Sequence, residues 1–406
     1  MAVAISKQTD RDITVDFKEQ TTIGTPVTGS GAERIRFATS PGFALETNQV
    51  PSTESRNDGL SRAAGLGRKQ VTGSISGPLS LGSYDTIIAA VMRSTFTADA
   101  TLDQTDFASN TIGVASGVVT VSGGSFITEG IRLYDVVQPG TGFNAADQSV
   151  NCLVTALTAT TMTLTRFDGV ALTDVAGGVA TWSVTVKKHI VQGTTDCAFT
   201  IETRRGLIDK SEQIDWARFG TLDFGISPDS EVTLGTSILG RNMTVLGTSS
   251  SPGFTSPTEY TSEALQSARA KLIIGTSQVI GLANFSFSLN LNLFRDQTVD
   301  ELTAEIGVGQ PTLTASIEVL EDDLTRVESY LNGTETGAAI IVEEPDATAP
   351  KDFISIAMPK VRFGSATASG LGADRFSSRT FPLLIDADLR GGASDATMFK
   401  IATSSA

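Results

Sequence analysis

The chain has 406 residues, of which 40% are hydrophobic and 18% charged, and its acidic excess gives a formal net charge of −15. This composition excludes a disordered chain, and the length allows two or three domains with their own cores. The acidity argues against a surface that grips nucleic acid. There is one histidine. Cys152 and Cys197 could pair in principle, but two cysteines in a chain of this length do not make a disulfide framework.

No apolar run has the length of a signal peptide or of a transmembrane helix. We therefore expect a protein that is made and folded in a cytoplasm and has no membrane partner. If it leaves the cell, it does so by a route other than secretion.

The first half of the chain predicts a strand within residues 34–47, a long polar loop over residues 46–70, and a second strand ending near residue 78. A helix follows, because Tyr84, Ile87, Ile88 and Val91 have the spacing of one helical face. Ser80 or Ser83 is expected to cap its start. Strands at residues 199–202 and a hairpin over residues 217–241 complete this half.

An interruption follows the first helix. Residues 97–185 contain short alternating stretches separated by glycine-rich turns, which predicts a compact β domain inserted at the surface of the parent fold. We expect this insert to be separable and to lie on the outside.

The second half repeats the order. Phenylalanine and leucine alternate with serine and asparagine over residues 285–293, which predicts a half-buried strand. A further strand leads into a helix that Leu320, Leu324, Val327 and Leu331 define, begun by Asp322 or Asp323 and closed near Gly333. A third, short helix is expected at residues 262–272. Phe224 and Phe363, each followed by glycine, are interpreted as equivalent.

The matched order indicates a duplication, although threonine/valine alternation is common and two β-rich stretches can look alike by chance. The predicted fold is mainly β, with two repeated β-sandwich domains, each with one flanking helix, and an inserted small β domain. We expect an N-terminal arm at 1–32, a first domain at 33–96 and 186–250, the insert at 97–185, a linker at 251–280 and a second domain at 281–406.

The long loop over residues 46–70 is locally basic through Arg56, Arg62, Arg68 and Lys69, although the chain is acidic. The corresponding stretch in the second half, residues 295–310, is acidic through Asp296, Asp300, Glu301 and Glu305. The charges suggest that the loop meets the acidic surface of another copy. The alternative is a solvated loop with no partner.

No set of catalytic residues is evident, so we expect no enzyme, cofactor or metal site. His189 is the sole imidazole and is expected at the surface. Asp223-Phe224-Gly225 copies a kinase triplet without its accompanying motifs. Asp386 and Asp388 share one face of a predicted strand, where a cation site competes with a solvated face.

Several stretches of the sequence resemble the major tail tube proteins of long-tailed bacteriophages. They are TGSISGPLS followed by SYDTIIAAVM, then SEQIDWARFGTLDFGISPDSEVTLGTSILGR, and the closing KVRFGSATA and FPLLIDADL. The resemblance implies sandwich domains whose sheets join side by side into stacked rings around a DNA channel, with the long loop reaching the adjacent ring. Because family members with one domain form six-membered rings, a chain with two domains implies a trimeric, pseudo-sixfold ring. It also implies a place in the virion tail, assembly in the host cytoplasm, and tape measure, distal tail and terminator proteins as partners.

The acidic composition suits a conduit, because a wall of like charge lets DNA slide without specific binding. The alternative is that the acidity serves solubility alone. Two other classes stay open at this point: a different β-rich tail component, and a carbohydrate-binding surface module. The small number of aromatic side chains counts against the latter.

Overall fold

The computed structural model describes most of the chain, namely residues 12–38, 41–54, 57–58, 60, 63–108, 110–246, 253–296, 305–322, 324–344, 350–369 and 376–404. Within these residues the protein is mainly β, as predicted, with two short helices. A branched sheet contains 19 strands, a second sheet contains eight, and two short strands form a separate hairpin. Neither helix is long and apolar enough to cross a membrane.

The strands of the large sheet come from two parts of the chain. The earlier part supplies β1 (Ile13–Glu19), β2 (Glu33–Arg34), β3 (Ala44–Val50), β4 (Gly65–Pro78), β13 (His189–Val191), β14 (Phe199–Arg205), β15 (Lys210–Phe219), β16 (Thr221–Ile226), β17 (Thr233–Gly240) and β18 (Asn242–Leu246). The later part supplies β19 (Ala270–Ile274), β20 (Ser277–Val279), β21 (Leu282–Asn290), β24 (Thr312–Leu320), β25 (Thr336–Glu343), β26 (Phe353–Phe363), β27 (Thr367–Ala368), β28 (Ser378–Ile385) and β29 (Lys400–Thr403). The separate hairpin is β22 (Phe294–Arg295) with β23 (Ile306–Gly307).

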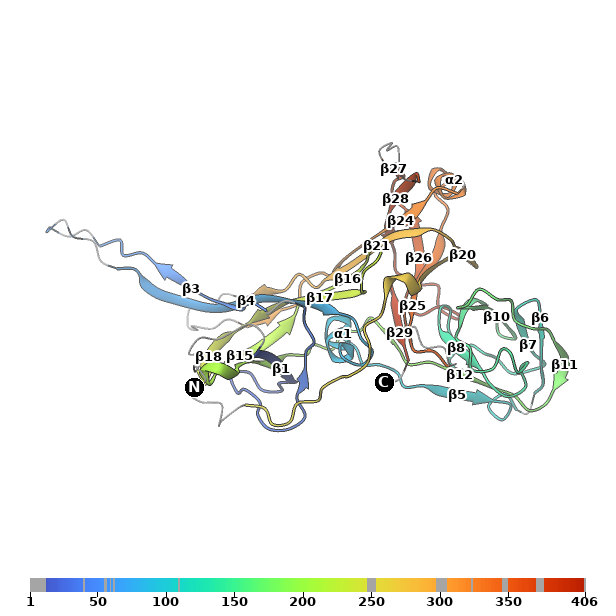
Figure 1. Ribbon diagram of the computed structural model, residues 1–406, viewed down its shortest axis with the longest axis horizontal. Coiled ribbons are helices and arrows are strands. Elements are labelled where there is room, and N and C mark those ends of the chain that lie inside the picture. The colour runs from blue at the N-terminus through green and yellow to red at the C-terminus, as the bar shows by residue number, and fades with distance from the viewer. Residues whose placement is uncertain are drawn as a thin grey trace, which may run out of the picture.

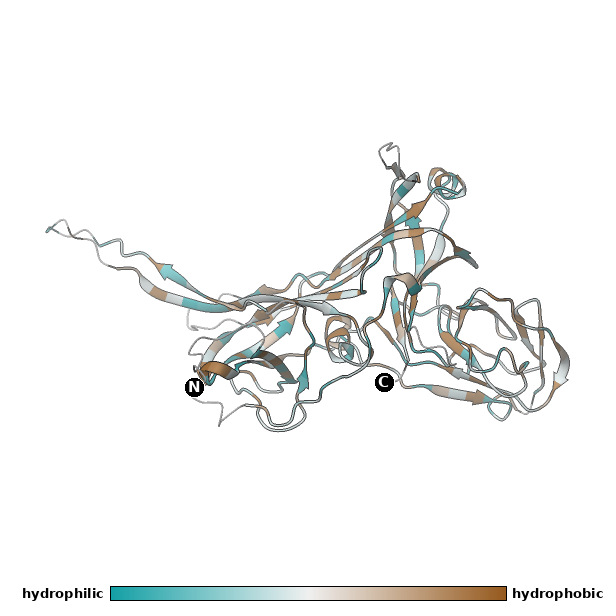
Figure 2. Cartoon of the chain, in the orientation of Figure 1, coloured by the Kyte–Doolittle hydropathy of each residue, from teal (hydrophilic) through white to brown (hydrophobic). Residues whose placement is uncertain are grey.

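One antiparallel run of strands crosses the whole molecule in the order β3-β4-β17-β16-β21-β24-β28-β27. Its centre is the pairing of β16 with β21, where the two parts of the chain meet edge to edge (Figure 1). Hydrophobic and hydrophilic residues alternate along these strands (Figure 2), so one face of the sheet is buried and the other is polar.

Each part of the chain covers its share of this sheet with a second layer. In the earlier part the layer is β2-β1-β14-β15-β18, and in the later part it is β20-β19-β25-β26-β29. The ends of β15 and β26 also pair with the central run, at Phe219–Ile238 and Phe363–Leu383. Phe219, and not Phe224 as interpreted from the sequence, therefore occupies the place equivalent to Phe363.

The first helix, α1 (Asp85–Met92), packs against β13, β15 and β16 and buries Ile87, Ile88, Val91 and Met92. The expected serine cap is wrong, because the helix has no side-chain cap. The Ser83 hydroxyl instead donates to the Ser80 carbonyl oxygen, at 2.9 Å, and also hydrogen-bonds the Ser80 hydroxyl, at 2.8 Å. These serines shape the turn before the helix.

The second helix, α2 (Thr325–Leu331), has no buried residue and no side-chain cap. The Asp322 carboxylate does not cap the helix but pairs with Arg326 on its first turn. Asp323 lies outside the described residues. Gly333 follows the helix with a φ of 61°, a left-handed conformation that suits glycine, so the predicted end is confirmed.

The helix expected at residues 262–272 is wrong. Only a short 3₁₀ turn, η3 (Ser267–Arg269), is present, and β19 begins directly after it. The preceding residues are extended, because the Leu265 amide donates to the Leu79 carbonyl oxygen and its carbonyl accepts from the Val232 amide. These long-range partners, and not local propensity, decide the conformation. A second 3₁₀ turn, η2 (Gly206–Ile208), joins β14 to β15.

The eight-stranded sheet is formed by one contiguous stretch of the chain that follows α1. Its strands are β5 (Ala100–Asp103), β6 (Ile112–Ala115), β7 (Val118–Val121), β8 (Val136–Pro139), β9 (Cys152–Leu157), β10 (Thr161–Arg166), β11 (Val175–Val179) and β12 (Ser183–Val186). They are arranged in the order β11-β6-β7-β10-β9-β8-β12-β5 around their own hydrophobic cluster, which includes Phe107, Phe126 and Trp182. We call this stretch the inserted module.

Candidate assembly interface

The β16–β21 junction shows how two sheet edges of this fold fit together. The two strands pair antiparallel over six residues each, from Thr221–Asn290 to Ile226–Phe285. On the buried face the Phe224 and Phe285 rings lie 6.1 Å apart, edge to face. On the polar face Ser288 and Asp223 are directly opposite each other, and the serine hydroxyl donates to the carboxylate. Backbone pairing and side-chain packing both hold the junction.

Two outer edges of the same run of strands have no neighbour within the described part of the chain. β3 pairs only with β4, and β27 pairs only with β28. Leu45 on β3 is 41% exposed, whereas Leu289 on β21 is fully buried. An exposed strand edge with an apolar side chain is a site for pairing with another chain.

The outward face of the central run is lined by small polar side chains. A shallow hollow on this face, about 280 Å³ in volume, is bordered by residues of five strands, among them Ser76, Asp223, Ser286, Ser288 and Thr314. Hydroxyl groups dominate, so the face offers hydrogen bonds and few cations.

The long loop predicted over residues 46–70 is in large part a β-hairpin. β3 and the first part of β4 pair from Ala44–Thr72 to Val50–Gly65, and the hairpin projects far from the body (Figure 1). Arg68 and Lys69 lie on β4, whereas Arg56 and Arg62 lie outside the described residues. The arm, as we call residues 44–70, has exposed Val50 and Leu66 as well as its charges.

The acidic residues predicted to meet this arm are only partly described. Asp296 and Glu305 are exposed neighbours beside the β22–β23 hairpin, and the Asp296 amide donates to the Glu305 carbonyl oxygen, at 3.2 Å. Asp300 and Glu301 lie outside the described residues. In the described part of the chain, no ion pair links the arm to Asp296 or Glu305. Their contact therefore stays a prediction about neighbouring copies.

Asp386 and Asp388 are not a shared site on a strand, because β28 ends at Ile385. The Asp386 carboxylate pairs with the Lys360 ammonium at 2.9 Å. Asp388 is buried, and the Arg390 guanidinium bound to it lowers the pKa of that carboxyl to about 2. Each carboxylate thus has its own cation from the chain. No group of three or more metal-ligating side chains occurs among the described residues.

The structure also shows where the other residues considered in the sequence analysis lie. His189 is half-buried at the start of β13 and pairs with Ala402 across to β29. Cys152 and Cys197 are both free thiols, and burial raises the pKa of each. Asp223 of the kinase-like triplet is the junction residue described above. None of these residues is brought together with another candidate.

The inserted module is fixed to the later part of the chain by a shared apolar cluster. Tyr134, Val136, Leu153 and Phe167 of the module pack with Ile273, Ala339, Ile341, Phe353, Ala357 and Ala402. The Phe167 and Phe353 rings lie 5.4 Å apart in an edge-to-face arrangement. No local sequence signal pointed to this contact, since all its partners are distant in the chain.

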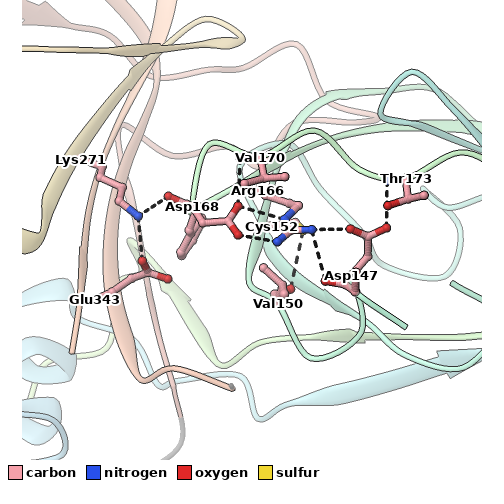
Figure 3. Close-up of polar contacts among 11 residues, drawn as sticks. Asp147, Val150, Cys152, Arg166, Asp168, Val170, Thr173, Lys271 and Glu343 are labelled. Atoms are coloured by element: carbon pink, nitrogen blue, oxygen red, sulfur yellow. Dashed lines mark hydrogen bonds and ion pairs between the residues drawn. The ribbon is translucent and has the colours of Figure 1, made fainter. Parts of the chain in front are cut away.

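Polar contacts continue across the same boundary (Figure 3). The buried Arg166 guanidinium binds the carboxylates of Asp147 and Asp168, which ties together two loops of the module. Next along the chain, the Phe167 carbonyl oxygen accepts from the Lys271 ammonium, which also pairs with Glu343 at 2.9 Å. Lys271 thus connects β19 and β25 to the module.

A buried ion pair lies at the other side of the boundary. Lys400 on β29 is 1% exposed, and its ammonium lies 2.6 Å from the carboxylate of the fully buried Asp135 in the module. Burial by itself would lower the pKa of Lys400, but Asp135 and Asp395 raise it above its ordinary value, so the side chain stays charged. This contribution to stability is present at neutral pH and is lost only as the pH rises through the raised pKa.

These contacts change the expectation that the insert is separable. Deleting residues 97–185 and bridging the gap with glycine and serine would expose Ile341 and Phe353, and would take Asp135 away from Lys400, which keeps Asp395 as a partner. We expect a large loss of soluble chain, measured as the soluble fraction after expression beside the full chain. A soluble deletion variant that still forms rings would contradict this expectation.

Together these features define a β-rich structural subunit with a projecting arm and, as far as the chain is described, two unpaired sheet edges. A family model described as phage tail tube protein matches residues 11–382, and the chain belongs to that family. None of the curated proteins matches the chain. The protein is therefore a structural, non-enzymatic component of the virion tail, and the family implies that it polymerises with itself.

Proposed function

We propose that three copies of the chain close into a pseudo-sixfold ring, and that these rings stack into a tube through which genomic DNA passes without specific binding. The observation that carries the proposal is the head-to-tail geometry of the β16–β21 junction. β16 is the last strand of the first repeat in the central run, and β21 is the first strand of the second. A ring repeats this junction between chains, with β27 of one copy pairing with β3 of the next.

The case for two repeats rests on matched strand registers. The β14–β15 pair shifts register between Phe199–Ala217 and Ile201–Ile214, and the β25–β26 pair shifts in the same way between Thr336–Val361 and Ala338–Met358. Both shifts place one extra residue on the second strand. A bulge at the same place in both sheets favours a common origin, because bulges are retained within families.

A second match aligns the central strands. Thr72 begins the sequence TGSI and pairs with Ala44 on one side and with Leu239 on the other. Thr314 begins the equivalent sequence TASI and pairs with Ser288, on the side that corresponds to Ala44. Asp223 pairs with Gly235 as Thr367 pairs with Thr380. Ala44 is thus equivalent to Ser288, and Thr367 to Asp223. Since Ser288 and Asp223 are opposite each other at the internal junction, we expect Ala44 and Thr367 to be opposite each other between chains.

In such a ring the polar face of the central run is the wall of the channel. The ring would continue the hydroxyl-rich surface around Ser76, Ser286 and Ser288 through all three chains. With Asp223 as a recurring carboxylate, this surface would have low affinity for phosphate, which suits passage of DNA. The other tail proteins, namely the tape measure, distal tail and terminator proteins, would bind at the ends or inside the tube.

Disulfide cross-linking tests the proposed register between β27 of one chain and β3 of the next directly. Ala44→Cys combined with Thr367→Cys, on a Cys197→Ser background, should give covalent trimers after mild oxidation of assembled tubes and separation on a denaturing gel. Cross-strand partners have the Cα separation that a disulfide requires. The matched control pairs Leu45→Cys with Thr367→Cys, because a shift of one residue turns the side chain to the opposite face.

The outcomes separate the possible assemblies. Trimers in the first variant and weak cross-linking in the control support the trimeric ring. A ladder that continues to covalent hexamers contradicts it, as does equal cross-linking of the two variants or none in either.

A further inference from the structure

Residues 264–266 form a strap that crosses from one part of the chain to the other. They lie on the earlier part, where Ala264 pairs with Ser80 and Gln266 pairs with Glu231 as isolated antiparallel bridges. Leu265 between them is fully buried and bonds the backbone of Leu79 and Val232. Directly afterwards the chain enters β19, which pairs with β25 of the later part. The strap thus holds the two repeats together beside their sheet junction.

The strap has a counterpart at the start of the chain. β1 pairs with β14 from Ile13–Arg205 onward, as β19 pairs with β25 from Ala270–Val342 onward. Ala264 lies six residues before Ala270, and Lys7 lies six residues before Ile13. Residues 7–9 therefore stand before β1 as residues 264–266 stand before β19. They lie outside the described residues.

The later part of the chain has the corresponding receiving surface. The Glu321 amide donates to the Ser377 carbonyl oxygen at 2.9 Å, as the Leu79 amide donates to the Val232 carbonyl oxygen at 2.8 Å. Among the described residues, no isolated β-bridge to Asp322 or Phe376 corresponds to the bridges of Ser80 with Ala264 and of Glu231 with Gln266. Phe376 is 82% exposed there.

Each of the two surfaces matches the polarity of the segment that pairs with it, residues 264–266 for the first and residues 7–9 in our proposal for the second. The first surface offers apolar Leu79 and Val232 to the apolar Leu265. The second surface is polar: Glu321 accepts from the Ser377 hydroxyl and pairs with Arg379, and the residue equivalent to Leu265 is the polar Gln8. Beside it Asp322, which also pairs with Arg326, would face Lys7, an opposite charge, where Ser80 faces Ala264. The partner that this surface fits is therefore the N-terminal segment of a second copy.

We propose that residues 7–9 of each chain strap onto the preceding chain of the ring, across Glu321–Asp322 and Phe376–Ser377, with Lys7 opposite Asp322. This inference rests on the proposed ring, because the second copy must stand next to β27. It gives the contact between chains the same two components as the contact within the chain, a strand pairing and a strap.

The test uses assembled tubes of the full chain on the Cys197→Ser background. Lys7→Cys with Asp322→Cys should form disulfide-linked species of two and three chains on a denaturing gel. The control is Lys7→Cys with Glu335→Cys, because Glu335 lies beyond the far end of α2. The Ala44→Cys, Thr367→Cys pair is run in parallel to report the ring itself.

Each outcome decides a separate point. Interchain products from the Lys7 and Asp322 pair, absent from its control, support the strap. Suppose that the Ala44→Cys, Thr367→Cys pair cross-links, and that the Lys7→Cys, Asp322→Cys pair either does not cross-link or forms its disulfide within a single chain. The strap is then wrong and the ring stands. If neither pair cross-links, the ring is wrong and the strap with it.

Discussion

Replacing Lys400 by alanine is expected to lower the free energy of unfolding by about 3–5 kcal/mol, because it leaves a buried carboxylate without its cation. Lys400 is buried on β29, and Asp135 in the inserted module is fully buried beside it. Water cannot replace the lost ammonium there without opening the boundary between module and sheet. The measurement is urea unfolding of the unassembled chain.

The matched control is Lys360→Ala. The Lys360 ammonium also pairs with a carboxylate, that of Asp386, but the partner is 71% exposed. Exposed pairs contribute about 1 kcal/mol or less. Losses of similar size in the two variants would show that the Lys400 pair is not the buried contact described above.

Reversing the four basic residues of the arm, Arg56, Arg62, Arg68 and Lys69, to glutamate is expected to leave the chain folded and to block tube growth. Each exposed pair with an acidic residue of the next ring would contribute at most about 1 kcal/mol, so the effect comes from repetition around the ring. The arm projects from the body and packs little of its own surface, so its substitution should not disturb the core (Figure 1). The measurement is the length of polymers by electron microscopy.

The dependence of tube growth on ionic strength is a second test of the contact between the arm and the next ring. Growth of the unaltered protein should weaken as ionic strength rises, since exposed charges are screened over about 10 Å at 0.1 M salt. The exposed Val50 and Leu66 offer an apolar alternative for the arm. Normal tubes from the charge-reversed protein would remove these charges from the mechanism.

Alternation and element order carried most of the fold prediction. The period-two pattern over residues 285–293 predicted a strand whose phenylalanines and leucines are buried, and Phe285, Phe287, Leu289 and Leu291 are buried as expected. The spacing of Ile87, Ile88 and Val91 likewise located α1 to within a few residues. Both signals are local, so the sequence shows them directly.

The errors have different causes: one segment is held by distant partners, and the other residues lie just outside the helix or strand to which they were assigned. Residues 262–272 have a short helical pattern, yet Leu265 bonds to Leu79 and Val232 and the segment is extended. Ser83 looked like a cap because its hydroxyl is near a helix start, but that hydroxyl donates to the Ser80 carbonyl oxygen. Asp386 and Asp388 looked like a pair because their spacing is two, but the strand had already ended.

The candidate interface was predictable only in outline. The duplicated order suggested repeats, but the free edges at β3 and β27 became evident only through the pairing of strands. The attachment of the inserted module was not predictable, because Lys400 and Asp135 are 265 residues apart and neither has a local signature.

The most direct test of the proposed assembly is a density map of the assembled tube at a resolution that traces the chain. It should show three chains in each ring, six repeats around the channel, β27 of each chain paired antiparallel with β3 of the next, and Thr367 opposite Ala44. A ring of six chains, or a ring in which β27 and β3 do not meet, would contradict it.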